Sequence, residues 1–478
     1  MTSNLLVIMS DEHQARAMGC AAHPFVQTPH LDKLAARGMR FTNAYTPSPI
    51  CVPARASFAT GRHVHKNRLW DNAMPYTGNI PGWGHALQHA GIPVESIGKL
   101  HYRNEQDNTG FDAEHIPMMV ANGVGMVWAS IRREDERIYG KKRMLGEHIG
   151  PGNSAYTDYD AAVTKCTVEW LQQQDTNEPW CLYVGMVAPH FPLVVPQEFY
   201  DLYPLDSLPE VKQHPSAGYQ QHPWIVKQNA FMDSESKFKD ESERLSAMAS
   251  YYGLCSWLDN NIGQILTTLE ETGLMDNTTV VYTSDHGDNV GARGLWGKSN
   301  MYEEACAIPL IVAGPGVKQG CCDTPVTLLD LSCTIANHFD QHIVGDEAHG
   351  NAVGKSLYAI ADEDYDNQRI VFSEYHAAGS VSGAFMIRQG RWKYIYYVGF
   401  EPELFDLESD PEELNNIAQQ PQSKNTLERL HQALLSICDP DAMSELAHED
   451  QAALIAHYGG REKAITLGAP AATPPPAT

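Results

Sequence analysis

Short apolar runs alternate with stretches of helical periodicity along most of this chain. The runs that predict buried strands are residues 4–9, 93–98, 180–187, 278–283 and 309–313. Helices are predicted for residues 28–37, 242–271 and 330–339. The run at 4–9 is apolar without alternation, which is typical of a strand buried on both faces in a parallel sheet. This order of elements predicts an α/β protein.

Two regions and the C-terminal part depart from the alternation. Residues 102–157 and 195–239 are polar and rich in Gly, Pro and aromatic residues, so we expect long functional loops. Beyond residue 369, three short runs predict a small antiparallel sheet, followed by helices near 425–436 and 449–458. The predicted units are therefore an α/β domain at 1–365, a C-terminal subdomain at 366–466, and a disordered Ala/Pro/Thr-rich tail at 467–478.

Composition and charge exclude several classes of partner. The chain has 478 residues, of which 43% are hydrophobic and 19% charged, as in a globular protein. Its net charge of −25 argues against a nucleic-acid partner and against an anionic membrane surface. No run is long and apolar enough to span a bilayer, and residues 5–9 are too short for a secretory signal. We therefore expect a cytoplasmic protein.

The most informative segment is residues 51–61, Cys-Val-Pro-Ala-Arg-Ala-Ser-Phe-Ala-Thr-Gly. Pro53 suits the first turn of a helix, and Gly61 can close that helix in a left-handed conformation. Cys51 would then lie at a helix N-terminus, where free N–H groups favour an anion. Arg55 can reach back to sulfate or phosphate oxygens. The alternative is a buried cysteine before an ordinary helix.

Two distant acidic clusters follow predicted strands. Asp11 and Glu12 come after the run at 4–9, and Asp285 and His286 come after the run at 278–283. Because ligands collect beyond the carboxyl ends of strands in α/β sheets, the clusters predict one shared metal site. Carboxylates suit Ca²⁺ or Mg²⁺, and a histidine ligand also admits Mn²⁺ or Zn²⁺. Alternatively, each cluster caps a helix or forms a turn.

Further polar residues lie near predicted strand ends. Lys99 and His101 are two apart and would point the same way in an extended segment. His190 lies in a Pro-flanked turn, Lys298 follows Asp285 by thirteen positions, and Asn72 follows the predicted Cys51 helix. Taken singly, these are ordinary strand-edge, loop and surface residues. Candidate pocket walls are Trp70, Tyr102, Phe111, Trp128 and Trp224.

The order of these motifs resembles that of the sulfatase family, within the alkaline phosphatase superfamily. The shared motifs are Asp-Glu at 11–12, CVPAR with TG at 51–61, GKLH at 98–101, PHFP at 189–192, DHG at 285–287, GxxGK at 294–298 and LFDL at 404–407. The resemblance covers nearly the whole chain. It implies an alkaline-phosphatase-like large mixed sheet flanked by helices, with a smaller C-terminal antiparallel-sheet subdomain.

The resemblance also implies a nucleophile and a metal. In the family, the cysteine at the Cys51 position is oxidised to formylglycine, whose hydrate attacks sulfur with one hydroxyl and expels sulfate after deprotonation of the other. Asp11, Glu12, Asp285 and His286 match the ligands of one divalent cation, usually Ca²⁺. Many relatives have Asp at the Glu12 position and Asn at the His286 position. These departures leave the fourth ligand and the choice among Ca²⁺, Mn²⁺ and Mg²⁺ open.

The remaining roles are assigned by the same resemblance. Arg55 and Lys99 match residues that hold the diol and neutralise sulfate, and His101 matches the base for the second hydroxyl. His190 and Lys298 match residues that bind sulfate and assist the leaving oxygen. Asn72 is a candidate contact to the transferred group or the leaving group.

We therefore expect hydrolysis of sulfate monoesters of the arylsulfatase type. An alternative is a phosphonate monoester or phosphodiester hydrolase that uses the same site. Another class, a non-catalytic metal- and anion-binding protein, applies if Cys51 stays a thiol. The expected partners are a small-molecule ester and a formylglycine-generating system for maturation. The size is compatible with a homo-oligomer, although no motif marks an interface.

Overall fold

The computed structural model describes residues 3–140, 143–174, 178–345, 350–467 and 473–476. Its centre is a large mixed sheet with the strand order β11-β2-β10-β9-β1-β7-β4-β5. The strands are β1 (Asn4–Asp11), β2 (Met39–Phe41), β4 (Val94–Lys99), β5 (Ala113–Met118), β7 (Cys181–Pro189), β9 (Thr278–Ser284), β10 (Leu310–Ala313) and β11 (Gly320–Cys322). Strands β9, β1, β7 and β4 run parallel, whereas β10 is antiparallel to β9 and β2.

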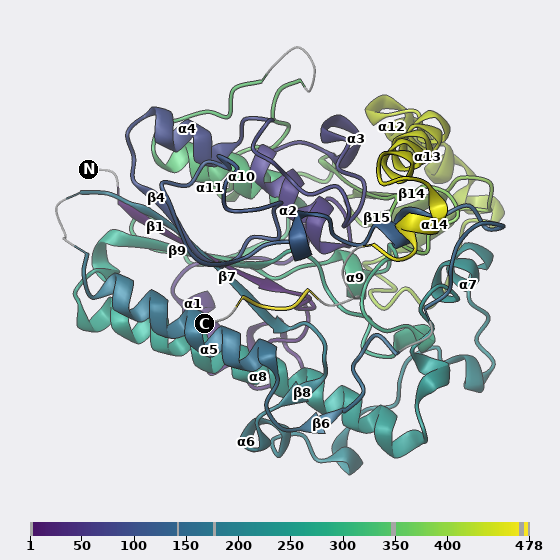
Figure 1. Cartoon of the computed structure of the whole chain (residues 1–478), viewed down its shortest axis with the longest axis horizontal. Helices are drawn as coiled ribbons and strands as arrows, with labels where there is room; N and C mark the ends of the chain where they lie inside the picture. Colours follow the sequence, from purple (N-terminus) through teal and green to yellow (C-terminus); the bar gives the residue numbers. More distant parts are fainter. Residues whose placement is uncertain (1–2, 141–142, 175–177, 346–349, 468–472, 477–478) are drawn as a thin grey trace.

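Helices cover both faces of this sheet (Figure 1). Residues Leu6 and Ile8 of β1 pack toward one helical layer, and Leu5 and Val7 pack toward the other. The first layer contains α1 (Pro29–Ala36), α5 (Ala155–Leu171) and α8 (Glu241–Glu271). The second contains α2 (Cys51–Thr60), α4 (Trp83–His89), α10 (Leu328–His338) and α11 (Leu357–Asp362). Burial on both faces explains the unbroken apolar run of β1.

The C-terminal part forms a separate antiparallel sheet of β13 (Ile370–Tyr375), β14 (Ala384–Gln389), β15 (Trp392–Tyr397) and β16 (Glu403–Asp406). Helix α12 (Lys424–Ile437) packs against this sheet, and it is followed by α13 (Pro440–His457) and α14 (Arg461–Ala464). The predicted mixed sheet and the smaller antiparallel sheet are both confirmed. The exact domain limits stay predictions.

Three sequence expectations need correction or comment. The region 102–157 is not entirely loop, because it contains β5, an edge strand whose half-buried polar residues give little apolar signal. Helix α13 starts well before residue 449, since Asp439 caps it and Pro440 occupies its first position. The predicted disorder of 467–478 falls partly on 468–472 and 477–478, outside the described residues. Thr473 within that stretch is buried.

The helices of the described ranges include none that combines the length and apolarity needed to cross a membrane.

Candidate active site

Four neighbouring parallel strands deliver the polar residues of the site at one edge of the sheet. Asp11 is the last residue of β1, Lys99 the last of β4, Asp285 follows β9, and His190 follows β7. Ser10 of β1 lies in register with Ser284 of β9, which brings the two acidic clusters together. The site thus lies beyond the carboxyl ends of the strands, as expected for this class of sheet.

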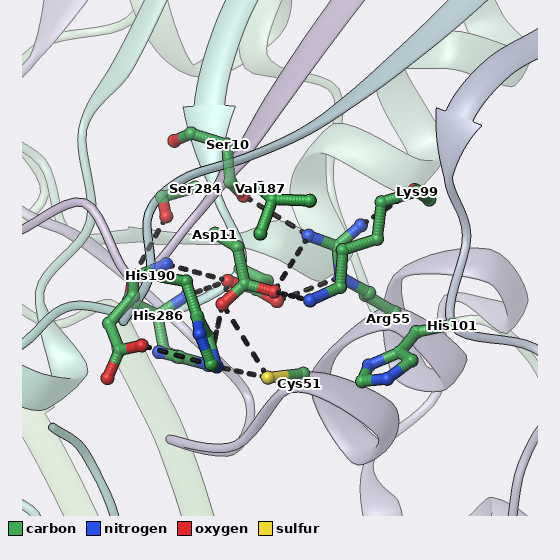
Figure 2. Close-up of polar contacts among 12 residues, drawn as sticks. Ser10, Asp11, Cys51, Arg55, Lys99, His101, Val187, His190, Ser284 and His286 are labelled. Carbon is green, nitrogen blue, oxygen red and sulfur yellow. Dashed lines mark hydrogen bonds and ion pairs between the residues drawn. The ribbon is translucent and has the colours of Figure 1, made fainter. Parts of the chain in front are cut away.

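Helix α2 places Cys51 at this edge. The helix starts at Cys51 itself, because Ile50 is extended, and it ends at Gly61 with φ 66°. The Val52 N–H donates to Asn72 Oδ1 at 3.2 Å, so Asn72 caps the start of the helix. Cys51 is buried, and its Sγ lies 3.2 Å from His286 Nε2 and 3.6 Å from Asp11 Oδ1 (Figure 2).

A candidate metal cluster forms around Cys51. One ligand atom each from Asp11, Cys51, Asp285 and His286 lies within 4.8 Å of all the others, and all four residues are buried. Residues 11 and 285 are far apart in sequence, yet the fold joins them. The structure therefore brings together three of the four predicted metal ligands with the nucleophile position.

Glu12, the fourth predicted ligand, belongs to an adjoining group. It clusters with Asp11 and His190, and its Oε2 lies 3.0 Å from Lys298 Nζ and 3.4 Å from His190 Nε2. Its backbone has φ 71°, an unusual value for a residue other than glycine. Burial raises the pKa of Glu12 well above its ordinary value, although Lys298 opposes this. Within the described residues, Glu12 Oε1 is buried and has no hydrogen-bond partner.

Arg55 and Lys99 neutralise the acidic residues from the other side (Figure 2). Lys99 Nζ lies 2.5 Å from Asp11 Oδ2, and Arg55 Nε donates to Asp285 Oδ2 at 2.8 Å. Burial alone would raise the pKa of Asp11, but the cations around it, Lys99 first and then Lys298 and Arg55, outweigh burial and hold that pKa well below its ordinary value. Arg55 was expected to donate to the transferred group, yet here its guanidinium is directed at protein acceptors.

The donor set fits a divalent cation. Three buried carboxylates, those of Asp11, Glu12 and Asp285, face the buried cations Arg55 and Lys99 and the half-buried Lys298. With all three carboxylates ionised the group is close to neutral by itself, so a dication would give it a net positive charge, which suits an anionic sulfate ester. The free Glu12 Oε1 and the clustered carboxylates are oxygen ligands of the type that Ca²⁺, Mg²⁺ and Mn²⁺ accept.

The two predicted proton carriers are neutral histidines. Burial lowers the pKa of His101 and of His190 well below the ordinary value, and Lys99 and Lys298 add to this effect. His190 Nδ1 donates to the Phe191 carbonyl at 2.6 Å, so the neutral ring presents Nε2 to the site. β4 ends at Lys99 and His101 has φ 61°, so the extended segment in which Lys99 and His101 were predicted to point the same way is not formed.

Two adjoining cavities meet at Lys298. An enclosed cavity of about 30 Å³ is lined by residues that include Cys51, Lys99, His101, Tyr156, His190, Lys298 and Thr473. A second cavity, of about 70 Å³, is lined by residues that include Met126, Phe191, Phe231, Met232, Trp296 and Lys298. Asn72 and Met126 also line both. The Lys298 ammonium lies 5.0 Å from the centre of the Phe191 ring.

The sequence missed most of the lining of the second cavity. Met126, Phe231 and Met232 lie in the two regions that composition had marked as functional loops, but no spacing singled them out. Of the predicted walls, Trp70 and Trp224 lie in hydrophobic core clusters, and Tyr102 and Phe111 pack with another. Trp128 supports the second cavity indirectly, because it stacks on Phe231 with ring centroids 5.4 Å apart.

Comparison with protein families gives two matches. A model described as "Sulfatase" matches residues 3–341. A model described as "N-sulphoglucosamine sulphohydrolase, C-terminal" matches residues 291–439.

Two curated relatives match over nearly the whole chain. A choline-sulfatase of Rhizobium meliloti (strain 1021) is 32% identical over 464 residues, which cover 94% of this chain and 89% of that protein. Arylsulfatase K of Danio rerio is 28% identical over 487 residues, covering 93% of this chain and 85% of the relative.

Solved structures share the fold. Phosphonate monoester hydrolase of Agrobacterium radiobacter superposes with a TM-score of 0.73 at 21% identity, covering 91% of this chain and 95% of that one. A protein in complex with its substrate D-glucosamine-2-N,6-O-disulfate has a TM-score of 0.71 at 23% identity, covering 94% and 99%.

Proposed function

The chain belongs to the sulfatase family and is a sulfuric ester hydrolase, and we propose that it cleaves sulfate monoesters of aryl type through a formylglycine made from Cys51. The observation that carries this proposal is the position of Cys51. It lies at the first turn of α2, beside Asp11 and His286, in a cavity that Lys99 and Lys298 also line.

The unconverted thiol is a poor nucleophile in this environment. Burial and the nearby Asp11 carboxylate raise the pKa of the Cys51 thiol to about 11. At neutral pH the thiol therefore stays protonated, whereas thiol nucleophiles react as thiolates. The family uses formylglycine, and the hydrated aldehyde offers two hydroxyl groups, one to attack sulfur and one to release sulfate. Oxidation of Cys51 removes the need for a thiolate.

The surrounding residues supply charge and proton transfer. The buried Lys99 and the half-buried Lys298 line the cavity of Cys51, where they oppose the negative charge that develops on the transferred sulfate group. His101 and His190 are neutral at neutral pH and can therefore accept protons. Arg55 acts indirectly by holding Asp11 and Asp285 in place.

We propose Ca²⁺ as the bound metal, held by Asp11, Asp285 and His286, with Glu12 completing the set from the adjoining group. A cation bound there would act as a Lewis acid toward an oxygen of the ester. The carboxylate-rich donors favour Ca²⁺ over softer metals, and His286 keeps Mn²⁺ as the alternative, with Mg²⁺ the third choice.

The second cavity favours an apolar leaving group. Phe231, Met232, Trp296 and Met126 give part of it an apolar and aromatic lining next to Lys298, and polar residues that include Asp71 and Asn72 line the rest. An aryl ring matches that lining. A quaternary ammonium group is the second candidate, because aromatic faces attract cations and because one relative is a choline-sulfatase. The phosphonate monoester alternative rests on neighbours that share the fold at low identity.

A substrate panel on protein of known oxidation state tests the proposal. Mass spectrometry of the Cys51 peptide measures conversion, which lowers the peptide mass by about 18 Da. Values of kcat/KM are then compared for 4-nitrophenyl sulfate, choline sulfate and an aryl phosphonate monoester, with Cys51→Ala as the inactive control. We expect the aryl sulfate to be preferred. A phosphonate preference contradicts the proposal, and a thiol fully retained in protein from its native cell favours the non-catalytic binder.

Maturation by a formylglycine-generating system is part of this proposal, since Cys51 must be converted before catalysis. The cytoplasmic location and the homo-oligomer stay predictions.

A further inference from the structure

A residue near the C-terminus contacts the catalytic cavity. The Thr473 Oγ1 atom lies 2.8 Å from His101 Nε2, and the Thr473 backbone carbonyl accepts a hydrogen bond of 2.6 Å from the Tyr156 hydroxyl. Thr473 is 9% exposed and lines the enclosed cavity together with Cys51. In Figure 1 this part of the chain is the yellow stretch beside α5, which carries Tyr156.

Thr473 is linked to both histidines of the site. It bonds His101 directly, and the Tyr156 ring that it fixes packs edge-on against His190, with ring centroids 5.8 Å apart. A single residue, 372 positions from His101 in sequence, thus touches the surroundings of both proton carriers. Neither contact involves the metal ligands.

His101 needs such a partner to hold one orientation. Its backbone is in the left-handed region, which surrounding contacts must maintain. Its other ring nitrogen, Nδ1, is buried and has no hydrogen-bond partner among the described residues. The hydrogen bond at one imidazole nitrogen decides which nitrogen carries the proton. Thr473 Oγ1 can accept a hydrogen bond from Nε2–H, and in that tautomer the lone pair is on Nδ1 of a ring that lines the cavity containing Cys51.

We propose that Thr473 is a positioning residue for catalysis, which fixes the ring and tautomer of His101 so that Nδ1 accepts the proton during sulfate release. The proposal rests on the proposed sulfatase function. It assigns Thr473, which lies in the stretch predicted as a disordered tail, to the active site.

The step that Thr473 serves conserves atoms and charge. After the alcohol has left, sulfate is bound through oxygen to the carbon derived from Cys51, which still carries one hydroxyl. The O–H bond of that hydroxyl breaks and its proton goes to His101 Nδ1. The C=O bond forms, the C–O bond to sulfate breaks, and sulfate leaves with the electron pair. Addition of water to the aldehyde restores the hydrate.

Kinetics of matched variants test the proposal. Thr473→Val removes the hydroxyl at nearly constant shape, Thr473→Ser restores it, and Thr466→Val changes an exposed threonine nearby as the control. For an aryl sulfate, we expect T473V to lower steady-state kcat about tenfold, with KM nearly unchanged. Release of the phenol should then show a burst of one equivalent per formylglycine, because sulfate release has become slow. T473S should recover most of the rate.

Other kinetic results overturn the proposal. If T473V keeps the kcat of the wild type, or raises KM alone, Thr473 is only a wall of the cavity. If a chain that ends at Leu467 has a higher kcat/KM, the segment obstructs the site and does not assist it.

A second measurement does not depend on activity. Exchange of the imidazole C2 proton of His101 for deuterium is followed by mass spectrometry in the thiol form of the protein. We expect faster exchange in T473V and in the chain that ends at Leu467, and wild-type exchange in T466V. Equal rates in all proteins overturn the placement of Thr473 against His101. If converted wild-type protein hydrolyses no sulfate ester, the proposed function is wrong. The exchange rates still test separately whether Thr473 contacts His101.

Discussion

Arg55 Nε donates to Asp285 Oδ2 across 2.8 Å, in a buried ion pair that joins helix α2 to the end of strand β9. The other guanidinium nitrogens donate to the Lys99 carbonyl, the Tyr183 hydroxyl, the Ser10 carbonyl and Asp11 Oδ2. The five N–H groups of an arginine are therefore matched by five protein acceptors. Arg55 fixes the spacing of the two carboxylates that are proposed to hold the metal.

Arg55→Lys should consequently weaken metal binding as well as stability. A lysine cannot reach both carboxylates, and breaking a buried ion pair costs about 3–5 kcal/mol. We expect a lower Tm and a smaller rise of Tm on addition of Ca²⁺. The control is Arg62→Lys, at the end of the same helix, where the buried arginine donates to backbone carbonyls. R62K should lower Tm without changing the response to Ca²⁺, and an R55K response equal to that of the wild type contradicts the assignment.

Removal of the metal should reduce activity without unfolding the protein. Arg55, Lys99 and Lys298 already balance the buried carboxylates, so a chelator should leave a folded chain with a lower Tm. Ligand binding at a hundredfold excess over Kd stabilises a protein by about 2.7 kcal/mol. Titration of Tm and activity with Ca²⁺, Mn²⁺ and Mg²⁺ measures the order of preference. Full activity after complete chelation would exclude a catalytic metal.

The role of His190 should depend on the leaving group. His190 Nε2 faces the site, 3.4 Å from Glu12 Oε2, where the ring can assist a departing oxygen once it has accepted a proton. Phenols leave with little proton assistance and aliphatic alcohols need more. His190→Ala should lower kcat/KM for an alkyl sulfate by about 100-fold and for an aryl sulfate by less than about tenfold. The exposed His148→Ala is the control, and equal losses on both substrates argue against proton transfer by His190.

Phe231 should determine preference for aryl substrates. It is 3% exposed, lines the second cavity and is held by stacking on Trp128. Phe231→Ala should lower kcat/KM for 4-nitrophenyl sulfate about tenfold, because contact with the leaving group is lost. Hydrolysis of methyl sulfate should change little. Phe400→Ala, in a loop of the C-terminal sheet, is the control, and a uniform loss on both sulfates assigns Phe231 to stability alone.

The core of the fold could be predicted because its signals are local. Residues 5–9 of strand β1 are all apolar since both faces are covered, and the acidic residues that end β1 and follow β9 mark the ligand edge of the sheet. Edge strand β5 was missed because half-buried positions carry mixed residue types. The hydrophobic pattern of a sequence reflects how far its residues are buried, and β5 is only partly buried.

The residues of the candidate site likewise divide into those that a local sequence signal predicts and those that it does not. Cys51, Lys99 and His190 belong to short motifs next to strands or helix ends, so sequence order was enough to group them. Phe231 and Thr473 join the site only through long-range packing, which leaves no local signal. Arg55 lies beside the predicted metal ligands, but its acceptors are backbone carbonyls and a tyrosine as well as acids. A sequence motif therefore identifies a residue of the site but does not predict which groups that residue contacts.

The C-terminal sheet contains a carboxyl group that should make stability depend on pH. Glu403 of β16 is 5% exposed, and the hydroxyls of Tyr302 and Tyr397 donate to its Oε2 at 3.0 and 2.9 Å. Burial raises the pKa of Glu403 from 4.5 to about 7, although these two hydrogen bonds oppose the shift. The folded chain thus keeps a proton that the unfolded chain releases at a lower pH.

The sign of the effect follows from this difference in proton binding. The contribution of Glu403 to stability is fully present below pH 4.5 and is lost as the pH rises to about 7. The loss amounts to at most about 1.4 kcal/mol for each pH unit in that range. Glu403→Gln keeps an acceptor for the tyrosines but cannot ionise, so the Tm of the wild type should fall relative to that of E403Q between pH 5 and 7. The matched control is the exposed Glu401→Gln, whose Tm should follow the wild type. Parallel Tm curves for E403Q and the wild type would mean that Glu403 does not change protonation on unfolding.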